Sequence, residues 1–110
     1  MKLFKGKKLL FKSVHIAAGF MDRFLGLMGK TSVPGSGAMY FPSCNSIHTY
    51  FMKIPIDVIM LDSKGRVVFM RENMGPWRMA MCSKAKDTME MKAGNIKALK
   101  LKPDDVLSMK

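Results

Sequence analysis

The side chains best suited to catalysis or ligand binding lie mostly in a weakly charged middle segment of the chain. Residues 31–61 contain one basic residue, Lys53, and one acidic residue, Asp57. His48 and Asp57 flank a bend expected at Pro55, so their side chains could face each other. An imidazole beside a carboxylate can orient a ligand or activate a nucleophile.

Cys44 would supply the nucleophile of a thiol enzyme if its side chain met His48. Such constellations are recognised by their geometry and not by their order in the chain, so the spacing does not establish one. The simpler interpretation makes Cys44 a small buried hydrophobe and His48 a hydrogen-bonded residue of the core or of a strand edge. We therefore assign no catalytic residue.

Asp57 stands inside the apolar run 56–61, where a charge must be paired or hydrogen-bonded. Candidate partners are Arg78, Arg23 and His48. A structural ion pair would satisfy the carboxylate, and so would a role in orienting a ligand.

Trp77 is the only tryptophan and lies in a loop between Pro76 and Arg78. It either plugs the core or, exposed beside Arg78, offers a stacking platform to a sugar, a base or a peptide side chain. Loops that carry such residues are often functional. The sequence predicts a non-catalytic binding module for a small molecule or a peptide. The residues expected to line its pocket are His48, Asp57, Trp77, Arg78 and Arg23.

Metal and cofactor sites are not expected. The chain has two histidines, His15 and His48, and two cysteines, Cys44 and Cys82, with no cluster at metal-ligand spacing. The glycines of 35–37 form a turn and not a phosphate-binding loop. Two distant cysteines do not make a disulfide framework, so we expect reduced thiols.

Length and composition indicate one globular unit. The chain has 110 residues, 48% of them hydrophobic and 25% charged, which is typical of a single folded domain. Thirteen methionines are many, and core filling is their expected role. We predict one domain over 1–110, with a flexible basic segment at 1–8.

The net charge of +11 favours attraction to polyanions, although it says nothing of the fold. The charge is either a solvated surface or a weak nucleic-acid or polyanion site, and no RNA-binding signature accompanies it. The lysines crowd both ends of the chain: Lys2, Lys5, Lys7, Lys8 and Lys12 at one, and Lys84, Lys86, Lys92, Lys97, Lys100 and Lys102 at the other.

No apolar stretch is long enough for a transmembrane helix, and the basic start lacks the apolar region of a signal peptide. A cytoplasmic location is therefore expected.

Short runs rich in apolar and β-branched residues, separated by Gly and Pro, predict strands through most of the chain. Expected strands are 9–16, 38–41, 46–52, 56–61, 66–71, 79–82, 88–91 and 106–109, and expected helices are 17–29 and 96–99. The turn 62–65 joins two of these strands into a hairpin. The pattern predicts a mainly β chain, bordering on α+β, folded as a compact antiparallel β-sandwich or barrel with one or two short helices.

Several motifs in a fixed order resemble a known family. They are 23–28 (RFLGLM), 38–41 (AMYF), 45–52 (NSIHTYFM), 54–62 (IPIDVIMLD), 65–68 (GRVV) and 76–78 (PWR). With them the chain resembles the uncharacterised bacterial and archaeal proteins of domain-of-unknown-function family 192. It departs from them at Asp104-Asp105, where Gly-Asp is usual. The resemblance implies a β-rich single-domain fold and brings no established activity.

Overall fold

The computed structural model describes residues 1–17, 38–50 and 52–110, and these fold mainly into strands. The strands are β1 (Leu3–Lys5), β2 (Lys8–Phe11), β3 (His15–Ile16), β4 (Ala38–Phe41), β5 (Ser46–His48), β6 (Ile56–Leu61), β7 (Val67–Met74), β8 (Met79–Met81), β9 (Asp87–Lys92) and β10 (Leu107–Met109). A single turn of helix, α2 (Asn95–Ala98), follows β9. The mainly β class predicted from the sequence is confirmed.

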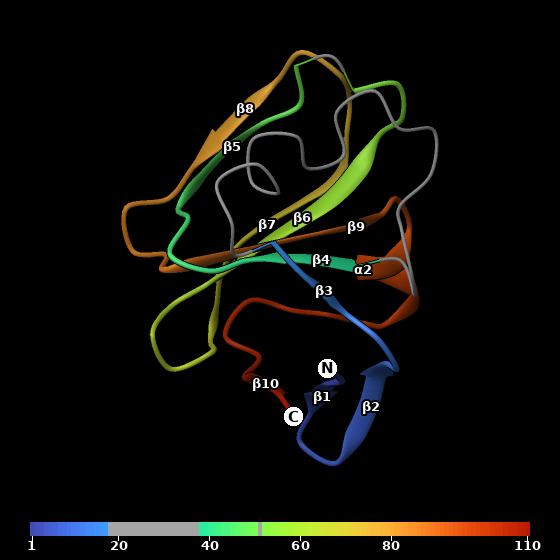
Figure 1. Cartoon of the computed structure of the whole chain (residues 1–110), viewed down its shortest axis with the longest axis vertical. Coiled ribbons are helices and arrows are strands. Elements are labelled where there is room, and N and C mark those ends of the chain that lie inside the picture. The colour runs from blue at the N-terminus through green and yellow to red at the C-terminus, as the bar shows by residue number, and fades with distance from the viewer. Residues whose placement is uncertain (18–37, 51) are drawn as a thin grey trace.

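The strands form three layers (Figure 1). The middle layer is a five-stranded sheet in the order β3-β4-β9-β6-β7. A three-stranded sheet, β10-β1-β2, lies on one side of it, and a two-stranded ribbon, β5-β8, lies on the other. Neighbouring strands run antiparallel except β3 and β4, which pair in parallel. The compact β fold with one short helix that the sequence predicted is therefore present, as several sheets and with one parallel pair.

The strand β6 is buried at every position because its two faces serve two different cores. Ile59 and Leu61 pack into a first core shared with the three-stranded sheet. Val58 and Met60 point the other way, into a second core shared with the β5-β8 ribbon. This double burial explains why the segment is continuously apolar and does not alternate with polar residues.

The hairpin of β6 and β7 is confirmed, and its turn is held by Asp62. The carboxylate of Asp62 accepts hydrogen bonds from the N–H groups of Lys64 and Arg66, both at 2.9 Å. Gly65 adopts φ 81°, a left-handed conformation that suits glycine.

Several predicted strands differ in extent from the observed ones. The segment 9–16 divides into β2 and β3, and β5 ends at His48 because Thr49 begins a turn closed by a 3.1 Å hydrogen bond from Met52 N–H to its carbonyl. The predicted helix 17–29 and Arg23 fall almost wholly outside the described residues.

The basic segment 1–8, for which flexibility was expected, contributes the central strand of the three-stranded sheet. Leu3 is fully buried there, and its strand pairs with β10, which comes from the opposite end of the chain. A three-residue strand with such a distant partner leaves no periodicity for sequence reasoning to detect.

Replacing Gly65 by Ala is expected to lower the free energy of unfolding by about 2 kcal/mol or more, because left-handed strain adds to a collision. A Cβ at Gly65 would lie 2.4 Å from the backbone oxygen of Leu107. Gly6 is the matched control: it has φ 61° and open space around it, so Gly6→Ala should cost only about 1 kcal/mol. Urea denaturation measures both, and equal losses would contradict the predicted collision.

Candidate functional site

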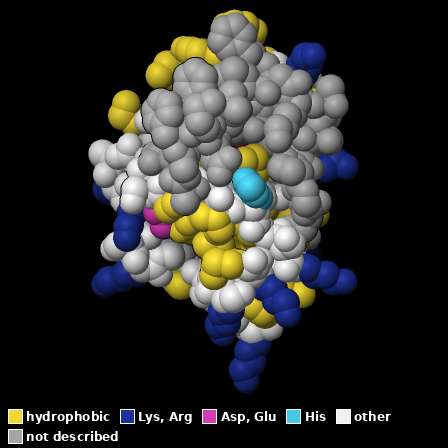
Figure 2. Space-filling view, in the orientation of Figure 1, with side chains coloured by type: hydrophobic (Ala, Val, Ile, Leu, Met, Phe, Trp, Pro, Cys, Tyr) yellow, Lys and Arg dark blue, Asp and Glu magenta, His cyan; other side chains and the backbone are white. Residues whose placement is uncertain are grey.

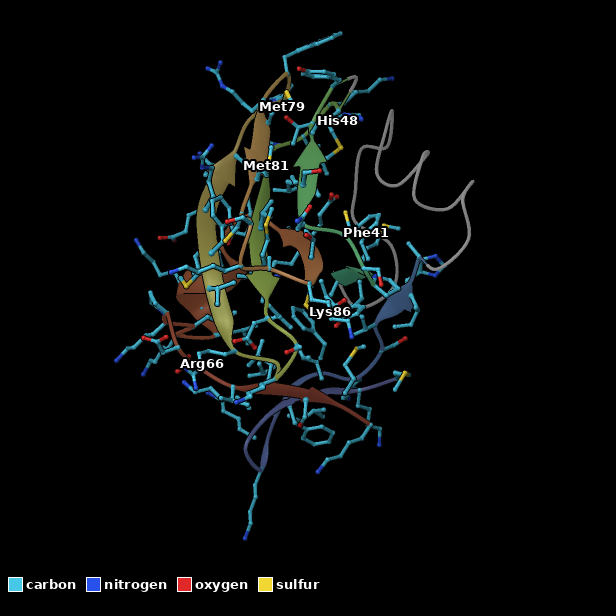
Figure 3. All side chains as sticks on the ribbon, turned by 90° about the vertical axis from the view of Figure 1, so that its left-hand side faces the viewer. Phe41, His48, Arg66, Met79, Met81 and Lys86 are labelled. Atoms are coloured by element: carbon cyan, nitrogen blue, oxygen red, sulfur yellow. The ribbon has the colours of Figure 1, made fainter. Side chains whose placement is uncertain are left out.

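The β5-β8 ribbon turns one face to the second core and the other outward. Ile47 on β5 and Ala80 on β8 are paired and buried. The outward face carries His48 opposite Met79, and Ser46 opposite Met81. Figure 3 shows His48, Met79 and Met81 at the same end of the molecule.

Thr49 fixes the loop that precedes β8. Its N–H donates to the carbonyl of Arg78 at 2.8 Å, and its own carbonyl accepts from the N–H of Trp77 at 3.0 Å. Its hydroxyl donates to the Gly75 carbonyl at 2.6 Å and accepts from the Arg78 N–H at 2.8 Å. Since Thr49 is fully buried, these four contacts anchor residues 75–78 to the end of β5.

Three rings stack above this anchor, and we call them the aromatic ladder: His48, Tyr50 and Trp77. The ring centroids of His48 and Tyr50 lie 4.8 Å apart, and those of Tyr50 and Trp77 lie 5.5 Å apart. The Tyr50 N–H donates to Nδ1 of His48 at 3.3 Å. A neutral His48 imidazole with this bond carries its proton on Nε2.

Trp77 is held in an unfavourable backbone conformation with its indole facing solvent. Its φ is 60°, and 58% of the residue is exposed. A bulky residue in the left-handed region costs about 1–2 kcal/mol. Arg78, next in the chain, is also exposed. Strain of this kind clusters at functional sites, and here the strained residue is an exposed aromatic that precedes an exposed arginine in the chain.

Asp57 lies on the other side of the five-stranded sheet from the ribbon and is fully buried. One carboxylate oxygen accepts the Asn73 N–H at 2.8 Å, and the other accepts the N–H groups of Gly94 at 3.0 Å and Ile96 at 2.9 Å. The last two donors open helix α2, so the carboxylate caps that helix from a distant strand. Backbone N–H groups, and not an arginine or His48, satisfy this carboxylate within the described residues.

The structure thus brings together His48, Trp77 and Arg78, and it holds Asp57 elsewhere. Arg23 lies outside the described residues. Tyr50, which joins His48 to Trp77, was not among the residues predicted for the site. Its place in the alternating run 46–52, on the same side as His48, was the signal that pointed to it.

The two cysteines are both half-buried. The Cys44 thiol donates to the carbonyl of Ser46 at 3.0 Å, and the Cys82 thiol lies 4.0 Å from the carbonyl of Val68. Within 1–17, 38–50 and 52–110, no hydrogen bond joins Cys44 to His48. The arrangement gives a thiol mechanism no support.

Glu90 is a buried carboxyl group that sequence reasoning missed. It lies on β9 between Met39 and Val58 and faces the second core, with 6% of the residue exposed. Burial raises its pKa to about 8, so the neutral form is favoured at neutral pH. Its position between Met89 and Met91 in the sequence was the only hint of an interior location.

A second polar location lies between the three-stranded and five-stranded sheets. A cavity of about 200 Å³ there is lined by Tyr40, Asp62, Lys64 and Asp87 among others. The Tyr40 hydroxyl donates to Asp87, which also accepts the Ser43 N–H at 2.8 Å. Burial, assisted by the Asp87 hydrogen bond, raises the pKa of the Tyr40 hydroxyl above its usual range.

No group of three or more His, Cys, Asp or Glu side chains suited to a metal ion occurs in the described part of the chain. The helical structure described there also includes nothing with the length and apolarity needed to cross a membrane.

Comparison with protein families gives one match over nearly the whole chain. The family model DUF192, described as "Uncharacterized ACR", matches residues 2–109. A curated relative, UPF0127 protein TK1120 of Thermococcus kodakarensis, is 35% identical over 100 residues, which are 86% of this chain and 63% of that protein. The chain therefore spans less than two thirds of that relative's length.

Two solved structures share the fold. One is a protein of unknown function from Novosphingobium aromaticivorans, with a TM-score of 0.76 and 21% identity, over 87% of this chain and 74% of the other. The second is a putative transcription regulator from Sinorhizobium meliloti, with a TM-score of 0.76 and 22% identity, over 86% of this chain and 79% of the other. At this identity they are evidence of a common fold alone.

Asp57→Ala is expected to lower the free energy of unfolding by about 3 kcal/mol or more, because it leaves buried N–H groups without an acceptor. Asp57→Asn keeps one acceptor oxygen and should lose less. Asp62→Asn is the control, since Asp62 also accepts two backbone N–H groups but in a solvent-facing turn. Urea titration measures the unfolding free energy of each variant. A larger loss in Asp62→Asn than in Asp57→Asn would refute the structural role of Asp57.

Glu90 is expected to make the protein less stable as the pH rises. Its folded-state pKa of about 8 exceeds the unfolded value, so the folded chain holds an extra proton between about pH 4.5 and 8. Stability should fall by about 1.4 kcal/mol per pH unit across that window. Glu90→Gln cannot titrate at this position and should lack this fall. Guanidinium denaturation at a series of pH values measures both proteins, and parallel pH profiles of the wild type and Glu90→Gln would count against the role of Glu90.

Proposed function

This chain belongs to DUF192, a family of uncharacterised proteins, and we propose that it is a non-catalytic binding module whose ligand stacks on the aromatic ladder. The main support is Trp77. Its indole is exposed, and hydrogen bonds between its loop and Thr49 hold its backbone at φ 60°.

The strain at Trp77 supports a ligand-binding role over a purely structural one. Glycine would relieve the strain at this position, and an indole that is more than half exposed contributes little burial in return. The stack with Tyr50 is worth about 0.5–1.5 kcal/mol, which roughly offsets the backbone cost. An exposed aromatic face at a strained backbone position suits a ligand that stacks on it.

Arg78 defines the second half of the ligand. It follows Trp77 directly, is exposed, and carries a planar cation suited to carboxylate or phosphate groups. The preferred ligand then has a planar ring to stack on Trp77 and an anionic group within reach of Arg78. Nucleotides and acidic peptides with an aromatic side chain both meet this description.

Polyanion binding by the lysines is the second candidate, and one observation favours it. The three-stranded sheet pairs β1 with β10, so Lys2 and Lys110 lie side by side at its edge. Lys2, Lys7 and Lys8 are exposed there, whereas Lys5 is bound to Asp105 at 3.0 Å. Figure 2 shows basic side chains projecting at this end of the molecule.

The two candidates separate in an amide chemical-shift titration with a short single-stranded oligonucleotide at low and at physiological salt. Binding on the ladder should shift His48, Tyr50, Trp77 and Arg78, and these shifts should persist in salt. Non-specific phosphate contacts should shift the lysines around β1 and β10 and disappear as salt is added. Shifts confined to those lysines would remove the nucleotide class from the ladder's ligands.

Trp77→Gly is expected to abolish ladder binding while leaving stability within about 1 kcal/mol of the wild type, because relief of strain compensates for the lost stack. Trp77→Ala keeps the strained backbone and loses the stack, so it should be the less stable of the two by about 1 kcal/mol. Thermal unfolding and the same titration measure both properties. If both variants lose about 2 kcal/mol or more of unfolding free energy relative to the wild type, the indole serves the fold and the proposal fails.

A further inference from the structure

Two exposed methionines on β8 are unexplained by the fold. Met79 and Met81 are 60% and 69% exposed, whereas Ala80 between them is buried. Core filling, the role expected for methionine, does not apply to either. Long apolar side chains so exposed on a strand need a reason, and the residues around them provide one.

The backbone pairing aligns His48 with these methionines. Hydrogen bonds from Thr49 N–H to the Arg78 carbonyl and from Cys82 N–H to the Asn45 carbonyl show which residue pairs of β5 and β8 are hydrogen-bonded. Because hydrogen-bonded and non-hydrogen-bonded pairs alternate along antiparallel strands, His48 and Met79 form a non-hydrogen-bonded pair. Side chains in such pairs are closest, with Cα atoms about 4.5 Å apart.

Met81 completes the group from the next outward position of β8. It lies on the same face as Met79 and diagonal to His48, a relation in which long side chains still reach each other. Two thioether sulfurs and one imidazole can therefore converge above the ribbon. Figure 3 shows the three labelled residues on these two adjacent strands.

We propose that His48, Met79 and Met81 bind a soft monovalent metal ion, copper(I) or silver(I). Thioether ligands select soft ions, and imidazole suits copper as well. Magnesium, calcium and manganese prefer oxygen ligands, which these three side chains do not offer. All three ligands are neutral, so a site on this strongly basic chain favours an ion of low charge.

Ligation requires a small change at His48. Its Nδ1 accepts the Tyr50 N–H, which leaves the proton of the neutral ring on Nε2. Binding through Nε2 moves the proton to Nδ1 and releases the Tyr50 N–H. That hydrogen bond is long, at 3.3 Å, so its loss is a modest cost, and the amide of Tyr50 becomes a reporter of metal binding.

The thiols are the natural competitors for a soft ion. Cys82 follows Met81, but it packs against the second core and its Sγ lies 4.0 Å from the Val68 carbonyl. Cys44 also packs there and donates to Ser46. Neither thiol belongs to the outward face that carries the proposed ligands. A background of Cys44→Ser and Cys82→Ala removes both thiols, and serine preserves a donor at position 44.

The experiment is a silver nitrate titration of the full chain in this background, in chloride-free buffer, followed by calorimetry and by the fluorescence of Trp77, the only tryptophan. We expect one silver ion per chain, quenching of Trp77 and a shifted Tyr50 amide. Met79→Leu and Met81→Leu should each weaken binding at least about tenfold, since each removes one ligand while keeping an apolar side chain. Met109→Leu, at the other end of the molecule, should leave binding unchanged.

Several results would overturn the proposal. They are an absence of silver binding, equal binding by Met79→Leu/Met81→Leu and the parent, or a Tyr50 amide that does not move. The metal site goes beyond the proposed ligand site and shares only His48 with it. Trp77→Gly tells the two apart, because it should end ladder binding while calorimetry still detects silver. Silver binding without any oligonucleotide contact at the ladder would leave the metal site standing alone.

Discussion

The burial of one carboxylate constrains the whole arrangement of strands. Asp57 sits on β6, the strand with no exposed position, and its oxygens accept N–H groups from β7 and from the start of α2. A buried charge must be satisfied, so β6 cannot slip along its neighbours. A shift of one residue would carry Asp57 into the second core and break all of these bonds. Register, helix position and the end of the hairpin are therefore set together.

Thr49 has the corresponding role on the opposite side of the sheet. It is buried, and its hydroxyl and backbone hold residues 75–78 in place. This anchor lets a tryptophan occupy a left-handed conformation that it would otherwise leave. The β5-β8 ribbon and its adjoining loop therefore position both the aromatic ladder and the methionine pair. The buried inward face of the ribbon stabilises it, and the outward face carries exposed side chains.

The sequence predicted the parts of the fold that rest on local pattern. The β6-β7 hairpin and β4 were found because apolar runs and a glycine turn lie next to each other in the chain. β1 was not found, since its partner β10 lies at the far end of the chain. Among the candidate site residues, Trp77 and Arg78 were proposed from residue type and loop position, and both are exposed. The partners of Asp57 were not predicted, because backbone N–H groups leave no trace in residue types. The exposure of Met79 and Met81 was not predicted either, because exposure depends on tertiary packing.

The closure of the three-stranded sheet also bears on the order of folding. Lys2 and Lys110 exchange backbone hydrogen bonds at 2.9 and 3.0 Å, and the two ends of the chain lie side by side (Figure 1). Contacts between such distant residues carry a large loop-closure entropy and tend to form late. During synthesis β1 is made before β10, so the three-stranded layer is complete only after β10 has been added. Until then β1 pairs with β2 alone, and its other edge lacks a hydrogen-bonded partner strand.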